Sequence, residues 1–250
     1  MNNELLVIAG TAAGLGLVHT IIGPDHYLPF IVISKARGWS KLKTMWITFL
    51  SGLGHILSSI FIGLIGIAIG ATLTKLEYIE SLRGDIAAWL LIAFGLAYLA
   101  WGFRYAVRHK PHSHPHPHLH LHEVYSSNER DHEEAHTHEH VHDTEHAHPH
   151  GEKPQGFNIT PWVLFTIFVF GPCEPLIPLV MYPAAKHNIL GAMVVAFLFG
   201  AVTIAVMMVL VLLGCSGLSF LPMKKMERYA HALAGLAILL CGSAILFLGL

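Results

Sequence analysis

Hydrophobic residues in this chain gather into six long runs separated by polar segments. The runs cover residues 5–34, 44–73, 86–107, 160–185, 190–213 and 229–250. Each holds roughly 20 or more mostly apolar residues, enough to cross the hydrocarbon core of a bilayer. A bilayer requires backbone groups to be satisfied internally, and the runs lack the alternating pattern of barrel strands. The sequence therefore predicts an all-α polytopic membrane protein with six transmembrane helices.

Two interruptions of these runs are alike. Residues 23–29 read Gly-Pro-Asp-His-Tyr-Leu-Pro, and residues 171–176 read Gly-Pro-Cys-Glu-Pro-Leu, an offset of 148 residues. Because each half holds an odd number of helices, two copies of one unit would enter the membrane in opposite directions. The sequence thus predicts a 3+3 inverted repeat with broken helices 1 and 4. Its parts are a first repeat at 1–108, a linking segment at 109–157 and a second repeat at 158–250.

Composition and the distribution of basic residues predict a membrane location and an orientation in the membrane. The chain is 54% hydrophobic and 12% charged, too apolar for an ordinary soluble domain. Twelve Lys and Arg residues fall in the connections after helices 1, 3 and 5, against Lys75, Arg83 and Lys186 on the other side. By the positive-inside tendency, the His-rich connection is cytoplasmic and both termini lie outside an inner or plasma membrane. The first run carries Glu4 rather than a basic segment, so we expect it to remain in the mature protein.

The segment 109–157 is rich in histidine, with fifteen of the twenty histidines of the chain. Imidazoles that alternate with Pro and Glu cannot bury a core, but they can bind a transition metal. We therefore predict a disordered cytoplasmic loop that binds metal through His112, His114, His116, His118, His120, His122, His136, His138, His140 and His142. Binding requires neutral imidazole, so it should weaken below roughly pH 6.5. A solvated spacer of biased composition is the alternative.

A second set of candidate ligands lies inside the apolar runs. Ionisable residues there are costly and are functional by default. His19 and His26 are seven residues apart, almost two helical turns. Pro24 interrupts the helix between them, and Asp25 precedes His26. We predict that these side chains and His55 of the second run converge on one cation. His55 taken alone could equally be a hydrogen-bonded packing residue.

The second interruption carries Cys173 and Glu174 where the first carries Asp25 and His26. A thiolate and a carboxylate are both metal donors, so we predict that they contribute to the same pathway. Glu174 is expected to act in metal release or proton exchange. Two alternatives stay open, because Cys173 could be a small packing residue and Glu174 could pair with a basic group.

The residues His19, Asp25 and His26 resemble the hallmark of nickel/cobalt transporter families, a His, four residues and then Asp-His in an early transmembrane helix. Five residues intervene here between His19 and Asp25. The predicted repeat and central His-rich loop are similar to nickel/cobalt exporters and to urease-accessory membrane proteins of the lysine-exporter superfamily. The Pro-Cys motif at Cys173 is also similar to transmembrane thiol-disulfide reductases, which use one cysteine from each half. Here the counterpart of Cys173 is Asp25.

These patterns predict a secondary transporter of a divalent transition metal, coupled to an ion gradient, and the resemblance implies nickel or cobalt as the cargo. We expect efflux, and an importer inhibited by the His-rich loop is the alternative direction. No P-loop or other nucleotide-binding motif occurs in the sequence. We expect no enzymatic activity, no prosthetic group and no nucleic-acid partner. The expected partners are the lipid bilayer, the metal ion and protons, and a homo-oligomer is left open. The alternatives are a membrane electron carrier acting through Cys173 and an accessory protein that supplies metal to a metalloenzyme.

Overall fold

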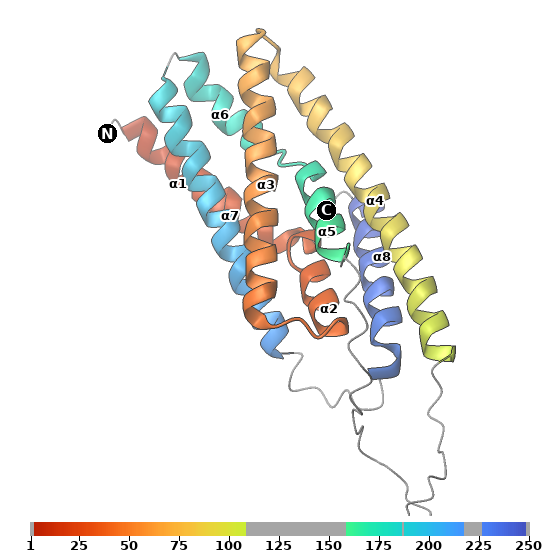
Figure 1. Cartoon of the computed structure of the whole chain (residues 1–250). Helices are drawn as coiled ribbons and strands as arrows, with labels where there is room; N and C mark the ends of the chain where they lie inside the picture. Colours follow the sequence, from red (N-terminus) through yellow and green to blue (C-terminus); the bar gives the residue numbers. More distant parts are fainter. Residues whose placement is uncertain (1–2, 109–158, 187, 218–226, 249–250) are drawn as a thin grey trace, which may run out of the picture. The chain divides into compact units, whose positions relative to one another are not determined.

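The computed structural model describes residues 3–108, 159–186, 188–217 and 227–248, and all regular structure in these ranges is helical (Figure 1). The elements in chain order are α1 (Asn3–Ile22), η1 (Pro24–His26), α2 (Leu28–Ala36), α3 (Lys41–Ala68), α4 (Leu73–Arg108), α5 (Thr160–Phe170), α6 (Leu176–Ala185), α7 (Ile189–Gly217), η4 (Glu227–Tyr229) and α8 (Ala230–Leu248). The prediction of an all-α chain is confirmed for these residues. The ten predicted histidine ligands of the linking segment lie outside them.

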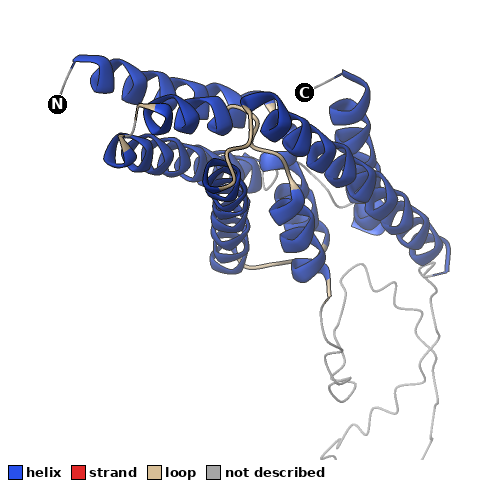
Figure 2. Ribbon diagram, turned by 90° about the horizontal axis from the view of Figure 1, so that it is seen from above, coloured by secondary structure: helices blue, strands red, loops and turns tan. Residues whose placement is uncertain are grey.

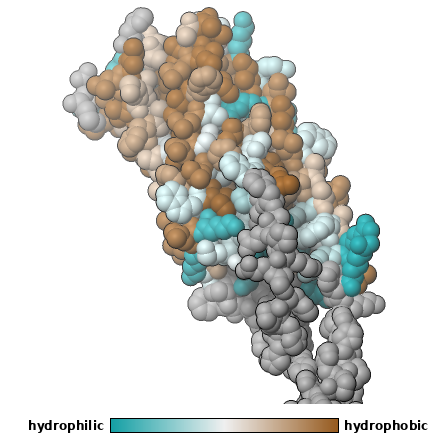
Figure 3. All heavy atoms as spheres, in the orientation of Figure 1, coloured by the Kyte–Doolittle hydropathy of each residue, from teal (hydrophilic) through white to brown (hydrophobic). Residues whose placement is uncertain are grey.

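Five helices, namely α1, α3, α4, α7 and α8, are long and apolar enough to cross a membrane. In Figure 3, apolar side chains cover most of the upper part of the visible face, and polar residues become more frequent toward the opposite end. A largely apolar outer surface on long helices fits a multi-pass membrane protein.

Two of the six predicted runs are discontinuous in the structure. The first is α1 followed by the turn η1 and the short helix α2. The fourth is divided into α5 and α6, of eleven and ten residues. Each of these short helices is about 15 Å long, half of what a membrane core requires. Both discontinuities fall at the Gly-Pro pairs, since proline cannot continue the hydrogen-bond ladder of the preceding helix.

The connection between α3 and α4 is tighter than the sequence predicted. Gly70 adopts a φ of 68°, and its N–H donates to Ile67 O at 3.1 Å, while Ala71 N donates to Gly66 O at 2.8 Å. This glycine turn ends α3 early and lets α4 begin at Leu73 rather than near residue 86. As a consequence, Arg83 lies inside α4 and not in the connection to which we had assigned it.

Helices α4 and α8 form the closest pair in the bundle and lie side by side in Figures 1 and 2. A Cβ atom on Gly95 would lie 2.4 Å from Leu239 N, and one on Gly235 would lie 2.3 Å from Leu99 N. The two backbones therefore touch directly, which only glycine permits at these positions. Elsewhere α1 packs against α7, and α3 packs against both α5 and α7.

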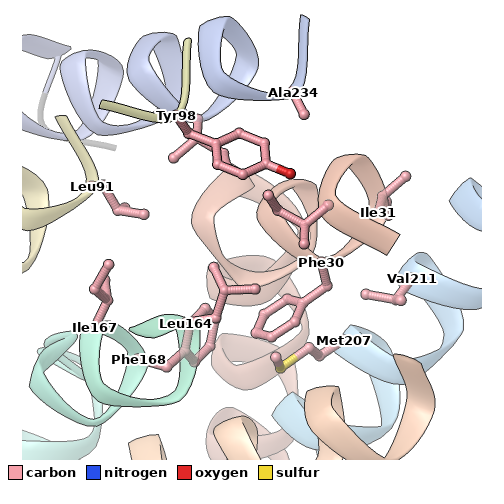
Figure 4. Packing of buried hydrophobic residues seen from close by; sticks show 12 residues of the cluster. Phe30, Ile31, Leu91, Tyr98, Leu164, Ile167, Phe168, Met207, Val211 and Ala234 are labelled. Atoms are coloured by element: carbon pink, nitrogen blue, oxygen red, sulfur yellow. The ribbon is translucent and has the colours of Figure 1, made fainter. Parts of the chain in front are cut away.

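The larger apolar cluster joins the two broken helices to α7. Figure 4 shows Phe30 of α2 beside Phe168 and Leu164 of α5 and beside Met207 of α7. The rings of Phe30 and Phe168 have centroids 4.9 Å apart and meet edge to face. This contact fixes the residues that follow the first break against the end of α5.

Candidate metal centre

The first break is a compact turn that brings two polar side chains into the bundle. Gly23 N donates to His19 O at 3.0 Å and closes α1, and His26 N donates to Gly23 O at 3.1 Å. A Cβ atom on Gly23 would lie 2.7 Å from His26 Nδ1 and 2.8 Å from Asp25 Oδ1. Only glycine leaves room for both side chains to fold back over the turn. The sequence Gly-Pro-Asp-His thus positions His26 locally, and its side chain is 2% exposed.

Three histidines from three elements meet at this turn. His19 comes from the last turn of α1, His26 from η1 and His55 from the middle of α3. The ring centroid of His26 lies 4.7 Å from the ring centroid of His19 and 5.2 Å from that of His55. One potential ligand atom from each histidine lies within 4.8 Å of the others. We call this set (His19, His26 and His55) the three-histidine centre.

Neighbouring acceptors fix which nitrogen of two rings is free. His26 Nδ1 lies 3.0 Å from Asp25 Oδ1 and 3.2 Å from Gly23 O, and His55 Nδ1 lies 3.2 Å from Phe168 O. Oxygen acceptors require these Nδ1 atoms to carry a proton, so in the neutral imidazole each Nε2 atom keeps its lone pair. Histidines that bind metals are usually held in this way by an acceptor on the second nitrogen.

The Nε2 atoms of all three histidines are buried and have no hydrogen-bond partner among the described residues. Leaving one such group unsatisfied costs about 1–3 kcal/mol. A cation bound by three lone pairs would remove that cost for the whole centre in one step. Asp25 contacts the centre through His26 Nδ1, so it orients that ring.

A cavity of about 250 Å³ adjoins the centre. It is lined by the three histidines and Asp25, and by residues of α4, α5 and the second break, among them Ala88, Phe168 and Pro172. A neighbouring cavity of about 350 Å³ shares Leu15 and Pro175 with it and continues between α1 and α6. Since a water occupies about 30 Å³, the first cavity has room for a cation with part of its hydration shell.

The second break does not bring its predicted ligands to the centre. The Cys173 side chain is fully buried in a separate apolar cluster with Ala12, Ile56 and Phe199. Glu174 is exposed, and neither residue lines the cavity. The break contributes its backbone and its prolines instead, because Gly171, Pro172 and Pro175 form part of the cavity wall.

A buried ion pair on α4, which the sequence pattern did not predict, holds the second break. Arg83 and Glu80 pair through Nη1 and Oε1 and are 9% and 0% exposed. Arg83 Nη2 donates to Val169 O at 2.9 Å and to Gly171 O at 3.1 Å. Glu80 Oε2 accepts from Cys173 N at 2.9 Å. The pair thereby satisfies carbonyls at the end of α5 and an amide that the break leaves free.

The only sequence signal for this pair was an acid and a base three residues apart beside an apolar run. Comparison of the chain with protein-family models, with curated proteins and with solved structures gives no match.

Proposed function

We propose that this protein carries a divalent transition-metal cation across the membrane through the three-histidine centre. The observation that supports the proposal is the convergence of three buried histidines, each with an Nε2 atom that has no hydrogen-bond partner among the described residues. A packing histidine would use both ring nitrogens in hydrogen bonds, since unpaired buried polar atoms are costly. His26 and His55 use Nδ1 in a hydrogen bond and leave Nε2 without a partner among the described residues.

The ligand type favours a borderline metal. Neutral imidazole suits Ni(II), Co(II), Zn(II) and Cu(II), whereas Mg²⁺ and Ca²⁺ prefer oxygen ligands. The linking segment 109–157 repeats the same ligand many times. We propose nickel or cobalt as the cargo, because of the resemblance of the His19 to His26 motif to nickel/cobalt transporters.

The position of the centre favours transport over storage. His55 lies near the middle of the 28-residue helix α3, and His26 lies in a break between two helices. Substrate sites of secondary transporters form at broken helices near the middle of the membrane. The inverted repeat is part of this proposal, supported by the packing of α1 on α7 and of α5 on α3. We propose efflux, coupled to an ion gradient, with the linking segment collecting metal in the cytoplasm.

The alternative of an electron carrier requires a thiol that can exchange with a partner. Cys173 is fully buried among apolar residues, and Cys241 is 3% exposed. Cys215 is half-buried, but Cys173, the residue through which such a carrier would act, offers no accessible sulfur, which favours transport over thiol-disulfide exchange. An accessory protein that supplies metal to a metalloenzyme would use the same centre, so only a transport measurement separates these two functions.

The decisive experiment is metal flux into liposomes that contain the purified protein, tested with Ni²⁺, Co²⁺, Zn²⁺, Mn²⁺ and Cd²⁺. We expect flux of the imidazole-preferring ions, and loss of that flux in His26→Ala and in His55→Ala. His231→Ala is the matched control. His231 is not part of the three-histidine centre, and its Nδ1 forms a hydrogen bond of 2.8 Å with Tyr98 OH. Flux at the wild-type level in the His26→Ala/His55→Ala double variant would refute the proposal.

A further inference from the structure

Helix α3 carries a stripe of buried hydroxyls on the face that holds His55. The stripe consists of Thr44, Thr48, Ser51 and Ser59, each at most 1% exposed. Spacings of three and four residues place these side chains and His55 one above another on a single face of the helix. The stripe begins in the first turn of α3, beside the N-cap Ser40, and reaches the three-histidine centre in the middle of the helix.

The two hydroxyls nearest to His55 on the N-terminal side are unpaired. Thr48 Oγ1 and Ser51 Oγ have no hydrogen-bond partner in the described part of the chain. A serine or threonine inside a helix commonly donates to the carbonyl four residues earlier, as Thr44 Oγ1 does to Ser40 O at 3.1 Å. Two neighbouring buried hydroxyls that lack this hydrogen bond lower the stability of the fold. Their position is better explained if they form hydrogen bonds with a different partner.

This part of the stripe lies on the side of the centre away from the cavities. His55 is the sole α3 residue that lines the cavity at the centre, and neither α2 nor α7 contributes to its wall. On the other side, the apolar cluster of Phe30, Phe168 and Met207 fills the space between α2, α5 and α7 (Figure 4). A Cβ atom on Gly52, next to Ser51, would lie 3.2 Å from Met207 Sδ. The centre is thus open toward α1 and α6 and closed toward the beginning of α3.

We propose that Thr48 and Ser51 line the closed half of the cation pathway, between the three-histidine centre and the end of the bundle where α3 begins. This inference rests on the proposed metal transport. When the apolar cluster parts, the two hydroxyls partner the water that the divalent cation retains. Hydroxyl oxygens hold such an ion weakly and let it pass, whereas the imidazoles bind it.

The test separates the rate of transport from the affinity of the centre. Thr48→Val and Ser51→Ala remove a hydroxyl with little change in volume and leave all three imidazoles in place. Flux of Ni²⁺ or Co²⁺ into liposomes should fall about tenfold in each, which matches the loss of one hydrogen-bond-sized contribution to the barrier. Equilibrium binding of the same ion to the detergent-solubilised protein should change less than about twofold, as no ligand is lost.

Thr48→Ser keeps the hydroxyl and should keep the flux. Ser243→Ala is the matched control, because Ser243 lies outside both cavities and donates to Leu239 O of its own helix at 2.9 Å. Wild-type flux in a correctly inserted Thr48→Val/Ser51→Ala variant would overturn the pathway alone. A parallel loss of binding and flux would also overturn it, since the hydroxyls would then belong to the centre. A wild-type protein that neither binds nor carries the ion would overturn the proposed function itself.

Discussion

The two breaks begin with the same Gly-Pro pair, and only the second depends on an ion pair from another helix. The first satisfies its polar groups within the turn, through His26 N on Gly23 O and His26 Nδ1 on Asp25. The second is held from outside by Glu80 and Arg83 on α4. Because its own turn is self-contained, the first break can offer an imidazole to a ligand. The second break forms part of the cavity wall, and the Phe168 carbonyl that precedes it accepts a hydrogen bond from His55.

The largest expected effect is on the support of the second break. Arg83→Met leaves the fully buried Glu80 carboxylate without its cation and frees two carbonyls. The loss of stability should be about 3–5 kcal/mol, as for other broken buried pairs. Thermal unfolding in detergent would measure it. Glu80→Gln/Arg83→Gln, which removes both charges, should recover part of that loss. A melting temperature unchanged in Arg83→Met would show that the second break holds itself.

In the first break, removing a ligand should matter more than removing its support. His26→Ala deletes one of three imidazoles and should abolish measurable binding of Co²⁺. Asp25→Asn keeps size and only weakens the acceptor of His26 Nδ1, so affinity should fall about 10–100-fold. Titration of Co²⁺ by absorption spectroscopy would compare the two. If Asp25→Asn were as severe as His26→Ala, the carboxylate would itself be a ligand.

The two glycines offer a matched test of the comparison. A methyl group on Gly23 would meet His26 Nδ1 and Asp25 Oδ1 below 3 Å, whereas one on Gly171 would lie 3.1 Å from both His55 Nδ1 and Phe168 O. Gly23→Ala must move a ligand and should lower metal affinity about tenfold or more, while Gly171→Ala needs shifts of a few tenths of an ångström and should cost only a few-fold. Metal titration of both variants is the measurement. Equal losses would make the breaks equivalent ligand supports.

The smallest effects are expected at the side chains of the second break. Glu174 is exposed, Cys173 is buried in an apolar cluster, and neither lines the cavity at the centre. Glu174→Gln and Cys173→Ser should therefore leave metal affinity and metal preference within about twofold, the range of substitutions that touch no shared partner. Competition between Ni²⁺ and Cd²⁺ for the purified protein would detect a change. A shift of preference away from Cd²⁺ in Cys173→Ser would place sulfur in the metal site after all.

The features that could be predicted from the sequence are those determined by nearby residues in the chain. Long apolar runs predict helices, Gly-Pro predicts the breaks, and histidines inside apolar runs predict a polar site. Glu80 and Arg83 were missed because an ion pair buried by α3, α4 and the second break has no local signature in α4. The directions of Cys173 and Glu174 depend on the turn after Pro172, which the similarity of the two motifs did not determine.

The three imidazoles come from three separate elements, and this has a consequence beyond affinity. A cation held by His19, His26 and His55 would act as a removable cross-link between α1, the turn that follows it and α3. Binding of the cation would then raise the free energy of unfolding by about 2.7 kcal/mol at a metal concentration a hundredfold above the dissociation constant. The metal-bound and metal-free proteins would differ in how readily this part of the bundle opens. Resistance to heat or to protease would therefore report whether the site is occupied.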